Sequence, residues 1–290
     1  MRPKDFSEMN SEKYIYIIAE IGINHNGSLT TAKELIDVAS NIGCDAVKFQ
    51  KRTIDIVYSE KTLNQYRESP WGKTQREQKE GLEFSLQDYD EINNYCKSKN
   101  LDWFASSWDE ESQKIMRKYN FPFNKIASAM SVNKSFVELV ASEIKPTFVS
   151  TGMMEIDDID QVVDIFKKHK CPLMLMHTVS TYPSKIENLN LKCINMLQER
   201  YKLPVGYSGH EVSVSPSIIA ASLGAAAIER HITLDRSMYG SDQSASLQKD
   251  GLRTLVNSIR KLPIILGDGK KRIIKKEFEI SNKLRYWNNQ

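Results

Sequence analysis

Residues 228–235, IERHITLD, join the start of a buried strand to a run of ionisable groups. They follow the small apolar run LGAAA and place Glu229, Arg230 and His231 in succession. Because side chains alternate between the two faces of a strand, Glu229 and His231 share one face. Polar groups that end an apolar strand are typical of the C-terminal mouth of a barrel enzyme, where catalytic residues gather.

Seven more short apolar or β-branched runs precede this stretch, and amphipathic helical patterns such as residues 29–43 and 156–170 lie between most of them. Alternating strands and helices require parallel pairing with right-handed crossovers. Eight such units predict an α/β fold, a single-domain (β/α)8 TIM barrel, although a doubly wound open sheet has the same local pattern. The expected strands lie within residues 14–23, 45–50, 101–108, 123–128, 146–152, 172–179, 203–209 and 226–233.

The pattern divides the chain into three expected parts: an N-terminal tail at 1–13, a catalytic barrel at 14–267 and a C-terminal extension at 268–290. The interval 51–84 is too long for an ordinary connection in a compact domain. Intervals of that length are usually functional, so we expect a functional loop or a lid there.

Composition excludes several classes of partner. The 40 basic and 37 acidic residues are spread along the chain and leave a net charge of +3, which implies no nucleic-acid partner. No apolar run approaches the roughly 18 residues that span a bilayer, and the start lacks a secretory apolar segment. The four cysteines form no Cys-x-x-Cys pair, so we expect reduced thiols and a cytoplasmic protein without a membrane partner.

Candidate ligand-binding residues recur at the ends of the expected strands. His210 and His231 end two consecutive strands and can meet at one metal ion, because neighbouring strands lie about 4.8 Å apart; the alternative is a structural, hydrogen-bonded role for each. Lysines together with hydroxyl groups suit a phosphate or a carboxylate, although a lysine can also extend to solvent and a serine can cap a helix. The strand-end set comprises Lys48, Ser107, Lys125, Ser128, Ser150 and Ser208.

Six motifs resemble the sialic acid synthase family, whose members condense phosphoenolpyruvate with an N-acylmannosamine-type aldehyde. They are IAEIGINHNGSL (18–29), DAVKFQ (45–50), STGM (150–153), GYSGHE (206–211), ERHITLD (229–235) and GSDQSASL (240–247). The resemblance covers residues 14–285 and implies a (β/α)8 barrel, a phosphoenolpyruvate and a sugar-aldehyde partner, and a homodimer.

The resemblance also implies roles for individual residues. His210 and His231 match the ligands of a divalent metal, Mn²⁺ or Mg²⁺. Lys48 and Lys125 match catalytic positions that hold phosphoenolpyruvate, and Gln50 and Asp242 match catalytic positions on the acceptor side. The substrate-binding positions are Asn26, Ser107, Ser128, Ser150, Ser180, Tyr182 and Ser208.

Several departures from the family pattern leave the acceptor open. Asn26 stands where some members carry Glu, and Met130 falls on a second acidic acceptor-side position. We also expect a short member without the antifreeze-protein-like C-terminal domain. Lys73, Arg76 and Lys79 resemble a segment of members that use a 6-phosphorylated sugar, although they also suit a solvated helix start.

Two other activities fit the same residues. A Schiff-base aldolase would use Lys48 or Lys125 as its nucleophile. A barrel that binds phosphoenolpyruvate or a sugar acid without turnover is the non-catalytic alternative, motivated by Asn26, Met130 and the expected missing domain.

Overall fold

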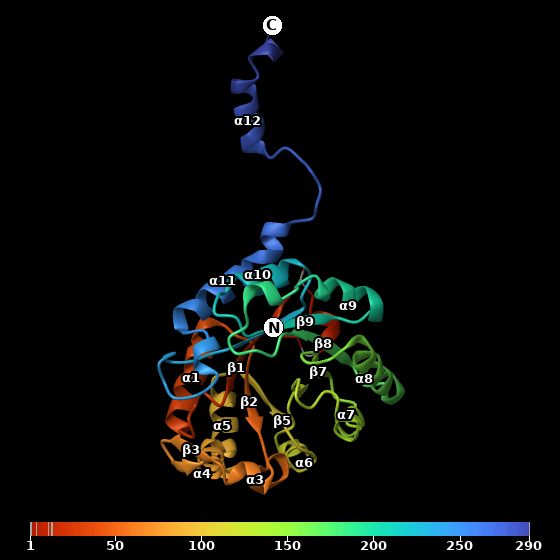
Figure 1. Ribbon diagram of the computed structural model, residues 1–290. Coiled ribbons are helices and arrows are strands. Elements are labelled where there is room, and N and C mark those ends of the chain that lie inside the picture. Colours follow the sequence, from red (N-terminus) through yellow and green to blue (C-terminus); the bar gives the residue numbers. More distant parts are fainter. Residues whose placement is uncertain (1, 4, 11, 13, 290) are drawn as a thin grey trace.

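The computed structural model describes residues 2–289 except 4, 11 and 13. Eight parallel strands close into a barrel in the order β1, β10, β9, β8, β7, β6, β5, β2 (Figure 1). The predicted barrel is therefore confirmed, and all eight expected strands are present. Their bounds are β1 Tyr16–Gly22, β2 Ala46–Lys51, β5 Asp102–Ser107, β6 Asn124–Ile126, β7 Thr147–Ser150, β8 Leu173–Thr178, β9 Val205–Gly209 and β10 Ala227–His231.

A ring of helices surrounds the strands (Figure 1). Local sequence sets their ends: the Ser28 side chain accepts a hydrogen bond from the backbone N–H of Thr31 at the start of the first helix, and Gly43 ends that helix with a φ of 94°. The ring consists of α1 Leu29–Ile42, α5 Leu86–Ser98, α6 Glu110–Met116, α7 Lys134–Ala141, α8 Ile156–His169, α9 Cys193–Tyr201, α10 Ser215–Ser222 and α11 Lys249–Leu266.

Aromatic side chains fill the N-terminal end of the barrel. The rings of Tyr16 and Phe123 lie 5.3 Å apart, and the ring of Phe6 packs 4.9 Å from that of Phe148. Phe6 belongs to the segment that we expected to be a tail, residues 1–13, yet it is buried in the core. Phe6 therefore helps to close the N-terminal end of the barrel, and the C-terminal end carries the open site.

The long interval after β2 folds into short elements instead of an irregular loop. They are α2 Ile54–Val57, α3 Glu60–Leu63, β3 Tyr66–Ser69, β4 Gly72–Thr74 and α4 Gln75–Leu82. The ring of Trp71 packs 5.7 Å from that of Tyr239 in the loop after β10. A side chain at Gly27, in the β1–α1 loop, would meet the carbonyl oxygen of Gly81 at 2.0 Å. The insertion thus packs tightly against two loops at the C-terminal end of the barrel.

The segment 268–290 contains α12 Lys275–Leu284 and η5 Tyr286–Asn289, which stand clear of the barrel (Figure 1). Its large side chains, among them Phe278, Leu284 and Trp287, are exposed. In the described part of the chain, no helix combines the length and the apolar character needed to cross a membrane.

Candidate active site

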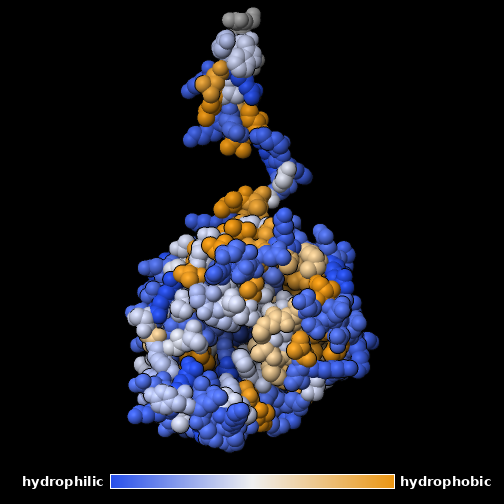
Figure 2. Space-filling model, viewed as in Figure 1, coloured by the Kyte–Doolittle hydropathy of each residue, from blue (hydrophilic) through white to orange (hydrophobic). Residues whose placement is uncertain are grey.

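A cavity of about 170 Å³ opens at the C-terminal ends of the barrel strands. Figure 2 shows this face hollowed near its centre, with hydrophilic residues inside the hollow. Most of the predicted site residues line it: Lys48, Gln50, Lys125, Ser128, Ser150, Ser180, Tyr182, Ser208, His210 and His231. Residues from widely separated parts of the sequence therefore meet in one space.

Ser107 was predicted to face the cavity, but its neighbour Ser106 lines the cavity instead. Ser106 pairs with Lys125 across the β5–β6 register, whereas Ser107 follows it by one residue. Side chains alternate along a strand, so a shift of one residue moves a hydroxyl from the cavity to the other face. Ser107 is fully buried, and its Oγ has no hydrogen-bond partner among the described residues.

Asn26 and Asp242 lie beside the cavity and not among the residues that line it. Asp242 follows β10 in the chain, and its Oδ2 lies 3.8 Å from Nδ1 of His231, which places it at the rim. The Oδ1 of Asn26 lies 3.7 Å from the position of a Cβ built on Gly240, so Asn26 faces the same loop. Met130 packs partly buried against the core and lines a separate surface groove.

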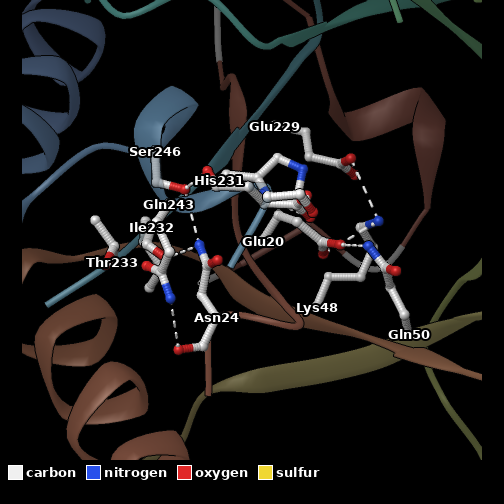
Figure 3. A network of polar contacts seen from close by, with 12 residues as sticks. Glu20, Asn24, Lys48, Gln50, Glu229, His231, Ile232, Thr233, Gln243 and Ser246 are labelled. Carbon is white, nitrogen blue, oxygen red and sulfur yellow. Dashed lines mark hydrogen bonds and ion pairs between the residues drawn. The ribbon is translucent and has the colours of Figure 1, made fainter. Parts of the chain in front are cut away.

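Four buried charged side chains line the cavity: Glu20, Lys48, Lys125 and Glu229. Figure 3 shows Lys48 beside the carboxylates of Glu20 and Glu229. Lys48 Nζ lies 3.1 Å from Glu20 Oε2 and 3.4 Å from Glu229 Oε1, and Lys125 Nζ lies 3.6 Å from Glu229 Oε2. Gln50 Nε2 donates a hydrogen bond of 2.9 Å to Glu20 Oε1. Two lysines thus share two carboxylates inside the barrel, where the low dielectric strengthens each interaction.

Burial and these neighbours shift the pKa values of the two carboxylates and the two lysines in different directions. Burial raises the pKa of Glu20, and Lys48 offsets this only in part. Burial would also raise the pKa of Glu229, but Lys125 and Lys48 together hold it below its usual value. The pKa of Lys48 is raised, because Glu20 and Glu229 outweigh its burial. Burial, helped by Lys48, lowers the pKa of Lys125 to about 8, so Lys48 carries the more persistent positive charge.

Hydroxyl groups surround the two lysines. Lys125 Nζ donates a hydrogen bond to Ser150 Oγ, and Ser208 Oγ donates one of 3.1 Å to Glu229. A side chain at Gly152 would meet Ser180 Oγ at 2.2 Å, so only glycine leaves room for this hydroxyl. Ser180 Oγ is buried without a hydrogen-bond partner in the described chain and remains available to a ligand. The arrangement suits an anion with several oxygen atoms.

The two predicted metal ligands lie side by side, with ring centroids 5.4 Å apart. His210 Nδ1 donates a hydrogen bond of 2.8 Å to the carbonyl oxygen of Val179, which leaves its Nε2 lone pair free. His231 Nδ1 is buried and has no hydrogen-bond partner among the described residues. The Tyr182 ring packs 4.1 Å from the ring of His210.

Both imidazoles are neutral at physiological pH. Burial, with the neighbouring His231, lowers the pKa of His210 to about 3, and burial, with Lys48, lowers that of His231 to about 3. Neutral imidazoles with free lone pairs fit a divalent cation whose remaining positions are filled by water or substrate. The described residues contain no group of three or more His, Cys, Asp or Glu side chains placed to hold a metal by themselves.

A buried ion pair connects the two histidine-bearing segments. Arg230 points away from the cavity, between Glu229 and His231 in sequence, and its Nη1 donates a 2.9 Å hydrogen bond to Glu211 Oε1. Glu211 directly follows His210, so the pair ties the segment of one histidine to that of the other. Of the three ionisable residues that end β10, Glu229 and His231 therefore line the cavity, and Arg230 pairs with Glu211 outside it.

Residue-by-residue reasoning missed Glu20 and the Arg230–Glu211 pair. Glu20 is the only acidic residue in the apolar strand YIIAEIG, and it is 1% exposed. A lone acid in a strand that is otherwise buried was the signal for it. Nothing in the sequence around Glu211 indicated its partner, because a helix and two loop segments separate the two residues.

Comparisons with known proteins agree with this geometry. The human N-acetylneuraminate-9-phosphate synthase is 38% identical over 272 residues, which cover 93% of this chain and 76% of that protein. The N,N'-diacetyllegionaminic acid synthase of Legionella pneumophila is 34% identical and covers 89% of this chain and 74% of its own length. A crystal structure of N-acetylneuraminic acid synthetase from Leptospira borgpetersenii, in complex with citrate, superposes with a TM-score of 0.82 at 30% identity, covering 94% of this chain and 93% of that chain.

The NeuB family model matches residues 35–271. This range includes the ends of seven barrel strands, and with them the lysines, the serines and both histidines of the cavity. The chain belongs to the NeuB family.

Proposed function

We propose that this protein condenses phosphoenolpyruvate with a sugar aldehyde, an N-acylmannosamine-like or other aldose, to give a 3-deoxy-2-keto sugar acid of the nonulosonic type and free phosphate. The observation that carries the proposal is the meeting, in one cavity, of two neutral histidines with two lysines and a set of hydroxyls. The relatives, which are named as synthases of such acids, support it.

The lysines and hydroxyls would hold phosphoenolpyruvate. Lys48 and Lys125 supply positive charge, while Ser150, Ser180 and Ser208 supply short polar contacts around the phosphate and the carboxylate. The anion would replace part of the interaction that the lysines now make with Glu20 and Glu229. The two lysines would then be shared between the anion and the buried carboxylates of Glu20 and Glu229, so both lysines are needed to offset the negative charge.

In the proposed reaction, the C3 carbon of phosphoenolpyruvate attacks the aldehyde carbon, water adds at C2, and phosphate leaves with cleavage of its C–O bond. His210 and His231 would hold a divalent metal, Mn²⁺ or Mg²⁺, which when bound supplies Lewis-acid polarisation of the aldehyde oxygen. Glu20 lies beside Lys48 on the cavity floor. Because burial raises its pKa, Glu20 can exchange a proton near neutral pH.

Phosphate release with a panel of aldoses tests the proposal. We expect the purified chain with Mn²⁺ or Mg²⁺ to release phosphate from phosphoenolpyruvate only when a suitable aldose is present, with a product mass equal to the condensed acid. Treatment with EDTA should remove this activity, and added metal should restore it. Binding of phosphoenolpyruvate without release across aldoses of four to six carbons, with metal present, would favour the non-catalytic alternative.

The lowered pKa of Lys125 leads to a pH dependence. The ammonium form, present below a pKa of about 8, attracts phosphoenolpyruvate, and deprotonation removes that attraction. We therefore expect KM for phosphoenolpyruvate to rise as the pH increases through about 8. Lys125→Arg should flatten this limb of the profile, because a guanidinium does not lose its proton in this range. Identical profiles for the two proteins would exclude Lys125 as the titrating group.

The lowered pKa of Lys125 is also what favours the second candidate, a Schiff-base aldolase, because an amine must be deprotonated to attack a carbonyl. Lys48 is unsuited to that role, since Glu20 and Glu229 keep it protonated. Borohydride treatment in the presence of substrate separates the two mechanisms. Covalent labelling at Lys125 would support the aldolase, and unlabelled protein with full sensitivity to EDTA would support the metal-dependent synthase.

We further propose a homodimer in the cytoplasm, where phosphoenolpyruvate is made. Sedimentation velocity would test the oligomeric state, and a monomer that retains full activity would rule out a functional dimer.

A further inference from the structure

We propose that the buried pair of Arg230 and Glu211 sets the spacing of His210 and His231, and thereby the affinity of the site for a divalent metal. Neither member of the pair touches the metal or the substrate in this role, so both are positioning residues. The inference rests on the proposed function, because it takes the two histidines to be the metal ligands.

The pair lies outside the barrel wall, beside strands β9 and β10 and helix α10. Both side chains are 1% exposed, and Arg230 Nη1 lies 2.9 Å from Glu211 Oε1. Arg230 stands opposite Gly209 in the register of β10 with β9. Its chain neighbours Glu229 and His231 line the cavity. The pair is therefore behind the metal-binding side chains and outside the cavity.

Arg230 holds the backbone that follows His210 at more than one point. Its Nη1 donates a hydrogen bond of 2.9 Å to the carbonyl oxygen of Ser213, and its Nη2 donates one to the carbonyl oxygen of Glu211. Glu211 directly follows His210 in the chain. Arg230 itself directly precedes His231. One guanidinium therefore fixes the backbone beside one histidine relative to the backbone beside the other.

The Glu211 carboxylate accepts further hydrogen bonds from β9 and α10. The hydroxyl of Tyr207 donates to Oε2 at 2.9 Å, and that of Ser217 donates to Oε1 at 3.2 Å. A side chain at Gly209 would meet Glu211 Oε2 at 2.6 Å and Tyr207 Cε1 at 2.7 Å. The network therefore packs directly against the residue that precedes His210. A carboxylate with several fixed donors has little freedom to move.

Few other hydrogen bonds orient the two imidazoles in the described part of the chain. The His210 ring donates one, of 2.8 Å, from Nδ1 to the carbonyl oxygen of Val179. His231 Nδ1 has no partner among the described residues, and Oδ2 of Asp242 lies 3.8 Å from it. The orientation of the His231 ring towards His210 therefore depends on the placement of β10, which Arg230 helps to fix.

Stability alone does not require an ion pair at this place. Taking two charges out of water costs free energy, and well-packed apolar side chains of similar volume often stabilise a fold equally well. A metal site, by contrast, needs ligands held to within about 0.5 Å. The supports behind metal ligands typically contribute about 10- to 100-fold to metal affinity. A rigid pair between the two histidine-bearing segments supplies such a support.

Mn²⁺ binding to the folded protein measures the positioning effect without turnover. We expect Arg230→Met to weaken Mn²⁺ binding by about 10- to 100-fold, because the two histidine-bearing segments lose their connection. The EPR signal of free Mn²⁺ gives this affinity. Phosphoenolpyruvate binding in the absence of metal should change by less than about threefold, because Lys48 and Lys125 keep their places.

Ile92→Ala is the control for a general loss of stability. Ile92 is buried in α5, which packs on β5 on the side of the closed barrel opposite β9. Its truncation leaves a cavity in the core and lowers stability by an amount similar to that expected for Arg230→Met. Because the change is far from both histidines, we expect Mn²⁺ affinity to stay within about threefold of the parent value.

The double variant Arg230→Met/Glu211→Gln separates stability from metal affinity. It removes the stranded carboxylate charge, so it should be more stable than Arg230→Met, and it serves as the test if the single variant does not fold. It does not restore the connection between the two segments. We therefore expect its Mn²⁺ binding to remain about 10- to 100-fold weaker than that of the parent.

Unchanged Mn²⁺ affinity in the double variant, or an equal loss of affinity in Ile92→Ala, would overturn the positioning role. The proposed condensation is judged separately, by phosphate release from the parent chain. A parent that binds Mn²⁺ more tightly than both Arg230 variants but releases no phosphate with any aldose would keep the positioning role and lose the reaction. A parent that condenses, with variants that bind Mn²⁺ as it does, would keep the reaction and lose the positioning role.

Discussion

Replacement of Lys48 by methionine is expected to lower kcat/KM for phosphoenolpyruvate by on the order of 10³-fold. Lys48 lies between Glu20 and Glu229 at 3.1 and 3.4 Å, and its raised pKa keeps it charged throughout the working pH range. Methionine has a similar length but no charge. The incoming anion would then face two carboxylates with only Lys125 to oppose them, and part of the Lys125 population is neutral near pH 8.

Lys51→Met is the matched control for this variant. Lys51 lies on the same strand, but its ammonium contacts Glu83 at 2.9 Å and lies outside the set of residues that line the cavity. We expect its kcat/KM to change by less than about threefold. Steady-state phosphate release measures both variants, and thermal unfolding shows whether Lys48→Met is folded. A folded Lys48→Met protein with kcat/KM within tenfold of the parent would contradict the proposed binding mode.

Replacement of Arg230 by methionine is expected to lower the free energy of unfolding by about 3–5 kcal/mol. Arg230 is 1% exposed, and its Nη1 donates to Glu211 at 2.9 Å, to the Ser213 carbonyl at 2.9 Å and to Ser217 Oγ at 3.0 Å. Methionine would leave the Glu211 carboxylate buried with only hydroxyl donors, from Tyr207 and Ser217. An unpaired buried charge is the main cost.

Urea denaturation measures this loss. Arg253→Met removes an arginine that pairs with Asp250 on the surface, and it should change stability by less than about 1 kcal/mol. Adding Glu211→Gln to Arg230→Met should recover part of the loss, because the second change removes the stranded charge. A loss below about 1 kcal/mol for Arg230→Met would show that the pair adds little to the fold.

Local sequence periodicity predicted eight parallel strand–helix units, and the resemblance to a barrel family favoured a closed barrel over an open sheet. Strand runs and helical patterns depend on neighbouring residues, so the eight strands, and the helical patterns between most of them, could be located without knowing their contacts. Alternation within a strand also placed Lys48 and Gln50 toward the interior, and the structure has both lining the cavity. It has Phe49 on the opposite face, with its ring 6.0 Å from that of Trp103.

The same reasoning could not supply the surroundings of a side chain where a single position or a distant contact decides them. Ser107 was chosen one residue beyond the side chain that reaches the cavity, because two serines in succession give alternation no fixed starting point. The segment 1–13 was expected to be a tail, yet Phe6 packs against Phe148 from the far side of the barrel. Asn26 follows β1 in a tight turn with a φ of 49°, which leaves it facing the Gly240 loop.

By itself, the amino-acid sequence determined the eight strands, their parallel pairing and the strand ends at which chemistry is concentrated, because these follow from local periodicity and from the handedness of crossovers. Only the tertiary structure decided which charges share the interior. Glu20, Lys48 and Glu229 lie on three strands, and their pKa values depend on burial and on distances of a few ångströms across the barrel. These electrostatic interactions join residues that are remote in the chain, so they cannot be predicted from a local sequence pattern.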